Sequence, residues 1–355
     1  MLVKKLYINN FRNLNNTQFI PIKEMNVICG ENAQGKTNLI EAIWLFTGAK
    51  SFRGNKDNEL INFNCEKAKL VLEFEAEGVE KTAEIIIDTK RNAVLNEKKL
   101  SSAAALAGKF CAIVFSPDDI GLVTEGPKKR RRFMDIAISQ IHPSYLGYLR
   151  NYTRAVTQRN IILKDIKKGL ADYSFLDVFE NEIVQNGKEI IKYRLDYVNQ
   201  IKDVIKNIYK GISAEKEELD IEYIMTSSYE NLEKDLYNAR QTDIFSAITS
   251  VGPHRDDLDF KINGVSVRNF ASQGQRRSVA LSLKLSEAEI LKNITGEFPV
   301  ALLDDVMSEL DPTRQDYILN HIKGWQVFIT CCDPSNTKNL DKGKVFSMSN
   351  GRLEE

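Results

Sequence analysis

The residues best suited to do chemistry are residues 30–37, which read Gly-Glu-Asn-Ala-Gln-Gly-Lys-Thr. This spacing is that of a P-loop, in which glycines allow backbone N–H groups to close around the α- and β-phosphates of a nucleotide. In such a loop Lys36 reaches the β- and γ-phosphates, and Thr37 offers a hydroxyl to Mg²⁺. We therefore expect ATP and Mg²⁺ as cofactors, with ATP bound by Gly30, Glu31, Asn32, Ala33, Gln34, Gly35, Lys36, Thr37 and Asn38.

The segments on either side of this loop fit a nucleotide site. Residues 25–29 are an apolar, strand-like run, and residues 38–46 have a helical pattern. A helix that starts at the loop adds the partial positive charge of its N-terminus to the phosphate site. The alternative, a glycine turn formed by chance, would not need either neighbour.

Two acids, Asp304 and Asp305, follow the apolar run 299–303. In a P-loop protein such an aspartate acts on Mg²⁺ directly or through water, and we expect Asp304 in that role. Asp305 could orient or deprotonate the attacking water as a general base. The predicted catalytic residues are therefore Lys36 and Asp305. The alternative is a solvated strand end with two surface acids.

Residues 270–277, Phe-Ala-Ser-Gln-Gly-Gln-Arg-Arg, precede a helix that is apolar nearly all round and should be buried. A capping serine, a glycine and two arginines at its N-terminus suit an anion. The alternative is an ordinary capped core helix. Downstream, Ser308 and Asp311 precede Pro312, which can start a helix.

Together these segments resemble the signature, the Walker B strand and the D-loop of the ABC ATPase superfamily. The signature would consist of Ser272, Gln273, Gly274 and Gln275, and the D-loop would contain Ser308 and Asp311. Gln273 stands where the signature commonly has glycine. Transporter ATPases of the superfamily have a switch histidine near residue 330, where this chain has Thr330, and a transporter ATPase is therefore disfavoured.

The composition limits what else the chain can be. Its 355 residues are 43% hydrophobic and carry a formal net charge of zero, so any DNA binding must use a local patch or two copies of the chain. No apolar stretch approaches the roughly 20 residues that span a membrane. The five cysteines have no C-x-x-C spacing, and the first residues have no signal-peptide pattern. We expect a cytoplasmic, reduced protein.

The pattern along the chain predicts how these residues are positioned. Strands are expected at residues 2–9, 18–22, 25–29, 69–75, 83–88, 110–115, 300–303, 326–330 and 344–347, with helices at 38–46, 275–292 and 312–322. Residues 128–209 have the spacing of two or three amphipathic helices, and Asn263-Gly264 marks a hairpin. We predict an α/β fold: an ABC-type P-loop ATPase head, split in sequence into residues 1–115 and 251–355, with a mainly helical second domain inserted at 116–250.

Six segments in order along the chain resemble the RecF family of recombination mediators. They are Leu6-x-x-x-Asn10-Phe-Arg-Asn13, the P-loop to Asn38, Phe115-Ser-Pro-Asp-Asp119, Arg130-Arg-Arg-Phe-Met-Asp135, Gly252-Pro-His-Arg-Asp256 and Ala271-Ser-Gln-Gly-Gln-Arg276. RecF-like proteins usually have threonines near residue 330, so the resemblance suggests that Thr330 takes part in γ-phosphate sensing.

The resemblance implies a mechanism. Members of the family bind ATP between the P-loop of one subunit and the signature serine of another, so Ser272 would cap the γ-phosphate held by Lys36 of a second copy. The resulting ATP-dependent homodimer would bind single-stranded and gapped duplex DNA. Slow ATP hydrolysis would release the DNA. With RecO-type and RecR-type partners, such a protein helps to load RecA at gaps during repair.

Two alternative functions are disfavoured, and the roles of several basic residues stay open. An SMC-type chromosome-organising ATPase head would need a long heptad-repeat coiled coil between Lys36 and Ser272. An ATPase–nuclease fusion would need an acidic metal-binding domain after residue 320. The basic run Lys128, Lys129, Arg130, Arg131 and Arg132 could contact DNA phosphates or pair with acids at the start of a helix. Arg12 and Arg53 could lie near the nucleotide or form salt bridges.

Overall fold

The computed structural model describes residues 1–332 and 343–354. The chain forms two compact units: residues 1–120, 208–216 and 277–355 make the first, and residues 121–207 and 217–276 make the second. The division into folding domains at residues 115 and 250 stays a prediction, because compactness does not test whether a segment folds on its own.

A mainly parallel sheet forms the centre of the first unit. Its strand order is β15-β14-β3-β13-β12-β8. The bounds are β3 Met25–Cys29, β8 Ala112–Phe115, β12 Val300–Leu303, β13 Val327–Cys331, β14 Gly343–Ser349 and β15 Arg352–Glu354. Strands β8, β12 and β13 are buried throughout, as expected for parallel strands covered on both faces. The carboxyl ends of β3, β12 and β13 therefore meet at one edge, where α/β proteins bind ligands.

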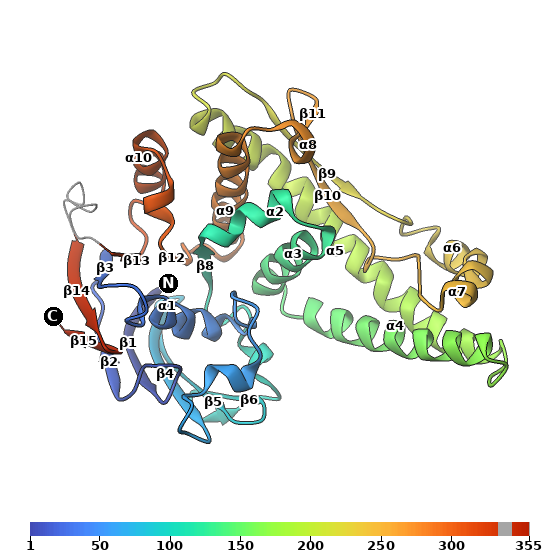
Figure 1. Ribbon diagram of the computed structural model, residues 1–355, viewed down its shortest axis with the longest axis horizontal. Helices are drawn as coiled ribbons and strands as arrows, with labels where there is room; N and C mark the ends of the chain where they lie inside the picture. Colours follow the sequence, from blue (N-terminus) through green and yellow to red (C-terminus); the bar gives the residue numbers. More distant parts are fainter. Residues whose placement is uncertain (333–342, 355) are drawn as a thin grey trace. The chain divides into compact units, whose positions relative to one another are not determined.

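A second, antiparallel sheet belongs to the same unit (Figure 1). Its order is β2-β1-β4-β5-β6-β7, with bounds Thr17–Phe19, Leu2–Asn9, Ala68–Ala76, Val79–Ile87, Arg91–Leu95 and Lys98–Lys99. Strand β4 alternates between buried and more exposed residues, which is the pattern of a sheet with one covered face. The first unit also contains α1 Lys36–Trp44 and α10 Pro312–His321, and short 3₁₀ turns at 45–47, 57–60, 103–106, 117–120 and 306–309.

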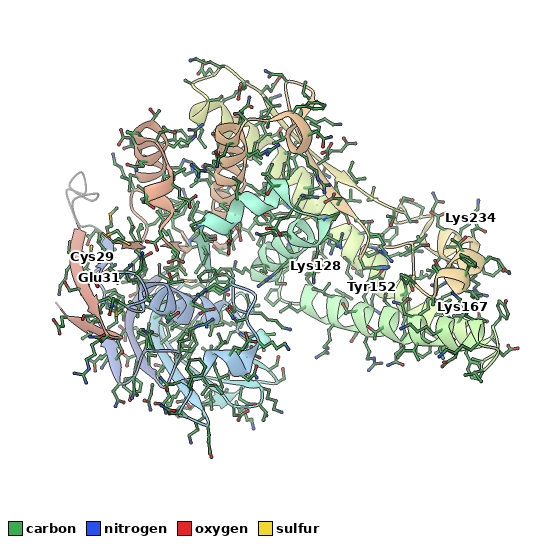
Figure 2. All side chains as sticks on the ribbon, in the orientation of Figure 1. Cys29, Glu31, Lys128, Tyr152, Lys167 and Lys234 are labelled. Carbon is green, nitrogen blue, oxygen red and sulfur yellow. The ribbon has the colours of Figure 1, made fainter. Side chains whose placement is uncertain are left out.

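The second unit is mainly helical. Its helices are α2 Gly121–Thr124, α3 Pro127–Ile141, α4 Tyr145–Lys167, α6 Leu232–Asn238, α7 Arg240–Ser246 and α8 Val267–Phe270, with a small sheet of β9 Leu219–Ile224, β10 Asp257–Ile262 and β11 Val265–Ser266. Two long helices, α5 Phe175–Ile212 and α9 Gln273–Thr295, each have residues in both units. Figure 2 marks α3 at Lys128 and α4 at Tyr152 and Lys167.

Buried charges in the second unit are paired. Arg159 is fully buried, and its guanidinium donates to Glu180 at 2.9 Å and to Asp243 at 2.6 Å. Arg194 is buried in the same way and bonds to Asp135 at 2.8 Å. Removing one member of such a pair leaves an uncompensated buried charge, so these pairs fix the packing of the helices.

His254 predicts a pH-dependent stability of the second unit. Its Nε2–H donates to the carbonyl oxygen of Thr249 at 3.0 Å, and its Nδ1 accepts from the Tyr152 hydroxyl at 2.7 Å. Burial lowers the pKa of His254 from 6.5 to about 4. Between these values the unfolded chain binds a proton that the folded chain does not, so stability falls as the pH falls through this range. We expect urea unfolding at pH 7, 6 and 5 to show this decline, and His254→Gln to remove part of it. An unchanged pH dependence in the variant would contradict the assignment.

Within the described residues, we find no helix that is both long and apolar enough to cross a membrane.

Candidate nucleotide-binding site

The loop between β3 and α1 has a backbone path that requires glycine at two positions. A Cβ on Gly30 would lie 2.3 Å from the carbonyl oxygen of Met348, a contact that real Cβ atoms do not make. Gly35 has φ +117°, a left-handed conformation that favours glycine, and it precedes the first residue of α1. The glycine spacing seen in the sequence therefore corresponds to steric requirements of this loop.

Lys36 folds back over the loop. Its Nζ donates to the carbonyl oxygens of Gly30 at 2.6 Å and Glu31 at 2.9 Å, and it lies 3.6 Å from Cys332 Sγ. The side chain is 4% exposed. A positive charge held inside the loop, next to the N-terminus of α1, favours an anion at this position.

Thr37, Asp304 and Thr330 come from three different elements and meet at the carboxyl ends of the strands. Asp304 Oδ1 accepts from the Thr37 hydroxyl at 2.8 Å and from the Thr330 hydroxyl at 3.0 Å. Burial raises the pKa of Asp304, and the two hydroxyl hydrogen bonds oppose that rise. The predicted Mg²⁺ ligands, Thr37 and Asp304, are thus in direct contact.

These donors fit Mg²⁺. The ion prefers oxygen ligands and commonly takes one or two from the protein, with waters and phosphates supplying the rest. A threonine hydroxyl and a carboxylate oxygen 2.8 Å apart, beside a phosphate loop, match that donor set. Among the residues that the structure describes, we find no group of three or more His, Cys, Asp or Glu that could hold a metal by itself.

Asp305 differs from Asp304 in its surroundings. It has φ +50°, which is unusual for a non-glycine residue, and its backbone N–H donates to the Thr330 hydroxyl at 2.9 Å. Its side chain lines a cavity, whereas that of Asp304 is buried. Thr330 therefore links the two acids: it donates to the first and accepts from the second.

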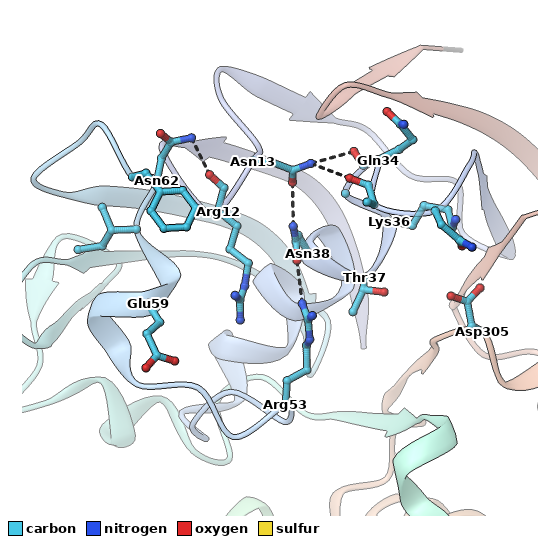
Figure 3. A pocket seen from close by; sticks show the side chains of 15 residues that line it. Arg12, Asn13, Gln34, Lys36, Thr37, Asn38, Arg53, Glu59, Asn62 and Asp305 are labelled. Atoms are coloured by element: carbon cyan, nitrogen blue, oxygen red, sulfur yellow. Dashed lines mark hydrogen bonds between the residues drawn. The ribbon is translucent and has the colours of Figure 1, made fainter.

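The cavity has a volume of about 470 Å³ and opens over the P-loop. Its wall is formed by Arg12, Asn13, Asn32, Ala33, Gln34, Gly35, Lys36, Thr37, Asn38, Arg53, Glu59, Ile61, Asn62, Phe63 and Asp305. In the close view of Figure 3, Lys36, Thr37 and Asp305 lie on one side, and Glu59, Asn62 and Arg12 lie on the other. Most of the predicted ATP-binding residues line this one cavity.

Two arginines of the wall are held by a buried acid. Glu41, on α1, is fully buried and accepts from Arg12 at 2.6 and 3.1 Å. It also accepts from the Ser51 hydroxyl and lies 4.0 Å from Arg53. Arg12 therefore forms a salt bridge, Arg53 lies at the outer limit of one, and both residues also line the cavity. Sequence reasoning did not single out Glu41, because an acid within an apolar helix pattern gives no sign of its partners.

Asn13 lies in the first RecF-like segment, and the sequence pattern predicts no role for it. Its amide nitrogen donates to the carbonyl oxygens of Ala33 at 3.3 Å and Gln34 at 3.1 Å, and its oxygen accepts from Asn38 at 2.8 Å (Figure 3). Arg53 donates to Asn38 at 3.0 Å. Asn13 thus ties the turn after β1 to the P-loop, and the asparagines of the segment 10–13 were the available signal.

The signature and D-loop segments are capped helix starts. Ser272 Oγ accepts from the Gln275 N–H at 3.2 Å, and Gln275 Oε1 accepts from the Ser272 N–H at 2.8 Å, which is a capping box. Ser272 and Gln273 are exposed. Ser308 donates to the carbonyl oxygen of Asp305 at 2.8 Å, and Asp311 caps α10.

In the basic run at the start of α3, some residues are paired with acids or carbonyl groups and others are exposed. Arg130 is 2% exposed and bonds to both oxygens of Asp257 at 2.6 and 2.8 Å, so the prediction of DNA contact is wrong for this residue in the observed conformation. Arg131 donates to the carbonyl oxygen of Asp256, and Lys129 pairs with Glu125. Lys128 and Arg132 are exposed. Phosphate contact by the exposed members stays a prediction.

The chain matches a known protein family over nearly its whole length. The model of the RecF/RecN/SMC N-terminal domain matches residues 2–354. The "DNA replication and repair protein RecF" of Clostridium perfringens strain 13 is 39% identical over 363 residues, covering 100% of both chains. The protein of the same name from Clostridium acetobutylicum is 38% identical, again over the whole of both chains.

Solved structures give the same result. A structure of the recombination mediator protein RecF with ATP, from the RecFOR pathway, is similar with a TM-score of 0.92 and 37% identity, covering 99% of this chain and 97% of that one. The Smc head domain of Pyrococcus furiosus is similar with a TM-score of 0.56 and 16% identity, covering 100% of this chain and 96% of that one. The second likeness concerns the fold alone. Together with the RecF structure and the family model, it confirms the predicted ABC-type α/β class.

Proposed function

The chain belongs to the RecF family of DNA replication and repair proteins, and from this we propose that it is an ATP-gated DNA-binding protein that acts at replication gaps. The observation that supports the proposal most is the convergence of Lys36, Thr37, Asp304 and Asp305 on one edge of the parallel sheet. A relative of known structure has been described with ATP. The alternative of an SMC-type head has weaker support, because that likeness is 16% identical.

Lys36 and the loop N–H groups bind the phosphates of ATP, and Thr37 and Asp304 hold Mg²⁺, which neutralises phosphate charge when bound. Asp305 accepts a proton from the attacking water. The Thr330 hydroxyl holds Asp304 and Asp305 in fixed positions relative to each other, because it bonds to both residues. Hydrolysis is slow, so that ATP acts as a switch.

In this proposal the signature segment acts on the ATP that a second copy of the chain binds. The segment consists of Ser272, Gln273, Gly274 and Gln275. The exposed start of α9 presents the Ser272 hydroxyl and the positive end of the helix to the γ-phosphate of ATP held by a second copy. Ser308 and Asp311 would line the same dimer contact. The dimer binds single-stranded and gapped duplex DNA, with exposed Lys128 and Arg132 as candidate phosphate contacts, and it works with RecO-type and RecR-type partners to load RecA in the cytoplasm.

Sedimentation of the full chain tests nucleotide binding, dimer formation and DNA binding in one experiment. We expect the monomer to shift to a dimer when ATP, Mg²⁺ and a gapped duplex are added. Ser272→Arg should abolish the shift while leaving ATP binding to the monomer intact, because the added side chain fills the space of the partner's γ-phosphate. Ser101→Arg, at an exposed serine of the first unit, is the matched control.

Loss of the Ser272 cap costs stability of the order of 1 kcal/mol, so thermal unfolding of both variants must be measured beside sedimentation. An ATP-driven dimer that persists in a folded Ser272→Arg variant would refute the trans site. No shift of the unaltered chain with ATP and DNA would refute the proposed gating.

A further inference from the structure

Two of the segments that resemble RecF lie away from the cavity over the P-loop. They are residues 130–135 at the start of α3 and residues 252–256 just before β10. Both belong to the second unit, and the structure brings them together. The guanidinium of Arg131 donates to the carbonyl oxygen of Asp256 at 2.6 Å. Figure 2 marks this end of α3 at Lys128.

A second arginine, Arg255, is exposed and directly precedes Asp256 in the chain. Its Nε–H donates to the carbonyl oxygen of Thr249 at 3.1 Å. Thr249 is fully buried, and its N–H and its hydroxyl both donate to the side-chain oxygen of Asn160, at 2.7 and 2.8 Å. Arg131 and Arg255, called the arginine pair below, are therefore each tied by a hydrogen bond to the backbone of the segment 249–256.

The acids next to the arginine pair are engaged by other partners. The Asp256 carboxylate accepts from the N–H and the hydroxyl of Thr226, at 2.8 and 3.0 Å. The Asp257 carboxylate accepts from Arg130 through both of its oxygens, at 2.6 and 2.8 Å. In the part of the chain that the structure describes, neither member of the arginine pair forms a salt bridge. Their two positive charges are therefore available to an anion from outside the chain.

We infer, on the basis of the proposed function, that the arginine pair binds phosphates of the DNA backbone. Guanidinium groups match phosphate oxygens well, because they can donate two parallel hydrogen bonds. Each member of the pair uses only part of its five N–H donors within the chain. An arginine that is already held by a hydrogen bond also loses less conformational freedom when a ligand binds. Exposed Lys128 and Arg132, at the same end of α3, add to the positive surface.

This assignment has two consequences for DNA binding. Contacts to phosphates carry no sequence information, so the arginine pair contributes equally to the affinity for any sequence. Contacts to phosphates also release counterions, so the affinity depends on the salt concentration. Both consequences can be measured.

Fluorescence anisotropy of the full chain with ATP, Mg²⁺ and two labelled gapped duplexes of unrelated sequence tests the site. In the double variant Arg131→Gln, Arg255→Gln, the slope of log K against log salt should fall in magnitude by about 2, close to 0.9 for each lost phosphate contact. At 0.1 M salt this loss should weaken both duplexes equally and by at least about tenfold. The affinity for ATP should not change.

Arg154→Gln is the matched control, because Arg154 is an exposed arginine of the same unit that lies 3.9 Å from Glu182. It should change neither the slope nor the affinity. Thermal unfolding of every variant shows which of them fold. Arg255→Glu, at an exposed position, is a second test that does not disturb Arg131, and it should weaken DNA binding more than Arg255→Gln does.

Three results would count against the site. If the folded double variant and folded Arg255→Glu keep the salt slope and the affinity of the unaltered chain, the arginine pair only supports the loop, and the proposed DNA binding still stands. If they keep DNA affinity but lose binding to polyglutamate in the same assay, the pair takes an acidic protein segment instead. If the unaltered chain binds neither duplex, both the proposed function and the site are refuted.

Discussion

Replacing Lys36 with alanine is expected to weaken ATP binding by at least about 100-fold, or roughly 3 kcal/mol. The reason is the geometry of the loop. Lys36 Nζ is held by the carbonyl oxygens of Gly30 and Glu31, in a position where few other groups can approach a phosphate. The charge is also 4% exposed, so water screens it little. Titration of Mg²⁺–ATP into the variant measures the loss directly.

Lys36→Arg is the sharper companion variant. The charge is kept, but the planar guanidinium cannot occupy the narrow position of an ammonium group between two carbonyl oxygens. We expect weaker ATP binding and lower hydrolysis with an intact fold. Lys50→Ala, at an exposed lysine of the same segment, serves as control. Unaltered ATP turnover in Lys36→Arg or Lys36→Ala would eliminate the proposed site.

Much of this site could be predicted because its parts are local in sequence. The P-loop needs glycine where a Cβ would collide or where φ is positive, and both constraints are visible in the sequence as glycines. Strand β12 is a continuous apolar run, so its end at Asp304 was visible. The RecF resemblance and the ABC-type α/β class rested on such segments, and both are confirmed by the comparisons.

The parts that could not be predicted depend on contacts between distant segments. Glu41 meets Arg12 only because α1 lies beside the turn after β1, and no spacing encodes that. In the sequence, Arg130 cannot be told from its neighbours in the basic run. In the structure it is buried against Asp257, 127 residues away. The short helices α6 and α7 were missed, since a seven-residue helix carries too little periodicity to be recognised.

The contrast between the two neighbouring acids supports a separate proposed role for each. Asp304 is buried, and its Oδ1 is already engaged by two hydroxyls, which suits a fixed ligand. Asp305 is turned by its positive φ toward the cavity, where a water attacking the γ-phosphate would lie. A backbone that accepts this strain to aim one carboxylate supports a catalytic role for it.

Asp305→Asn is therefore expected to lower ATP hydrolysis by about 10²- to 10⁴-fold, the usual contribution of a general base. ATP affinity should change little, because the amide keeps the size of the carboxylate and the Asp305 N–H bond to Thr330 is a backbone bond. Sedimentation with ATP should show a dimer that persists, because ATP binding still forms the dimer and hydrolysis no longer releases it. Asp316→Asn, at an exposed aspartate of α10, is the matched control. Normal hydrolysis by Asp305→Asn would remove Asp305 as the base, and loss of ATP binding instead would reassign it to the nucleotide's support.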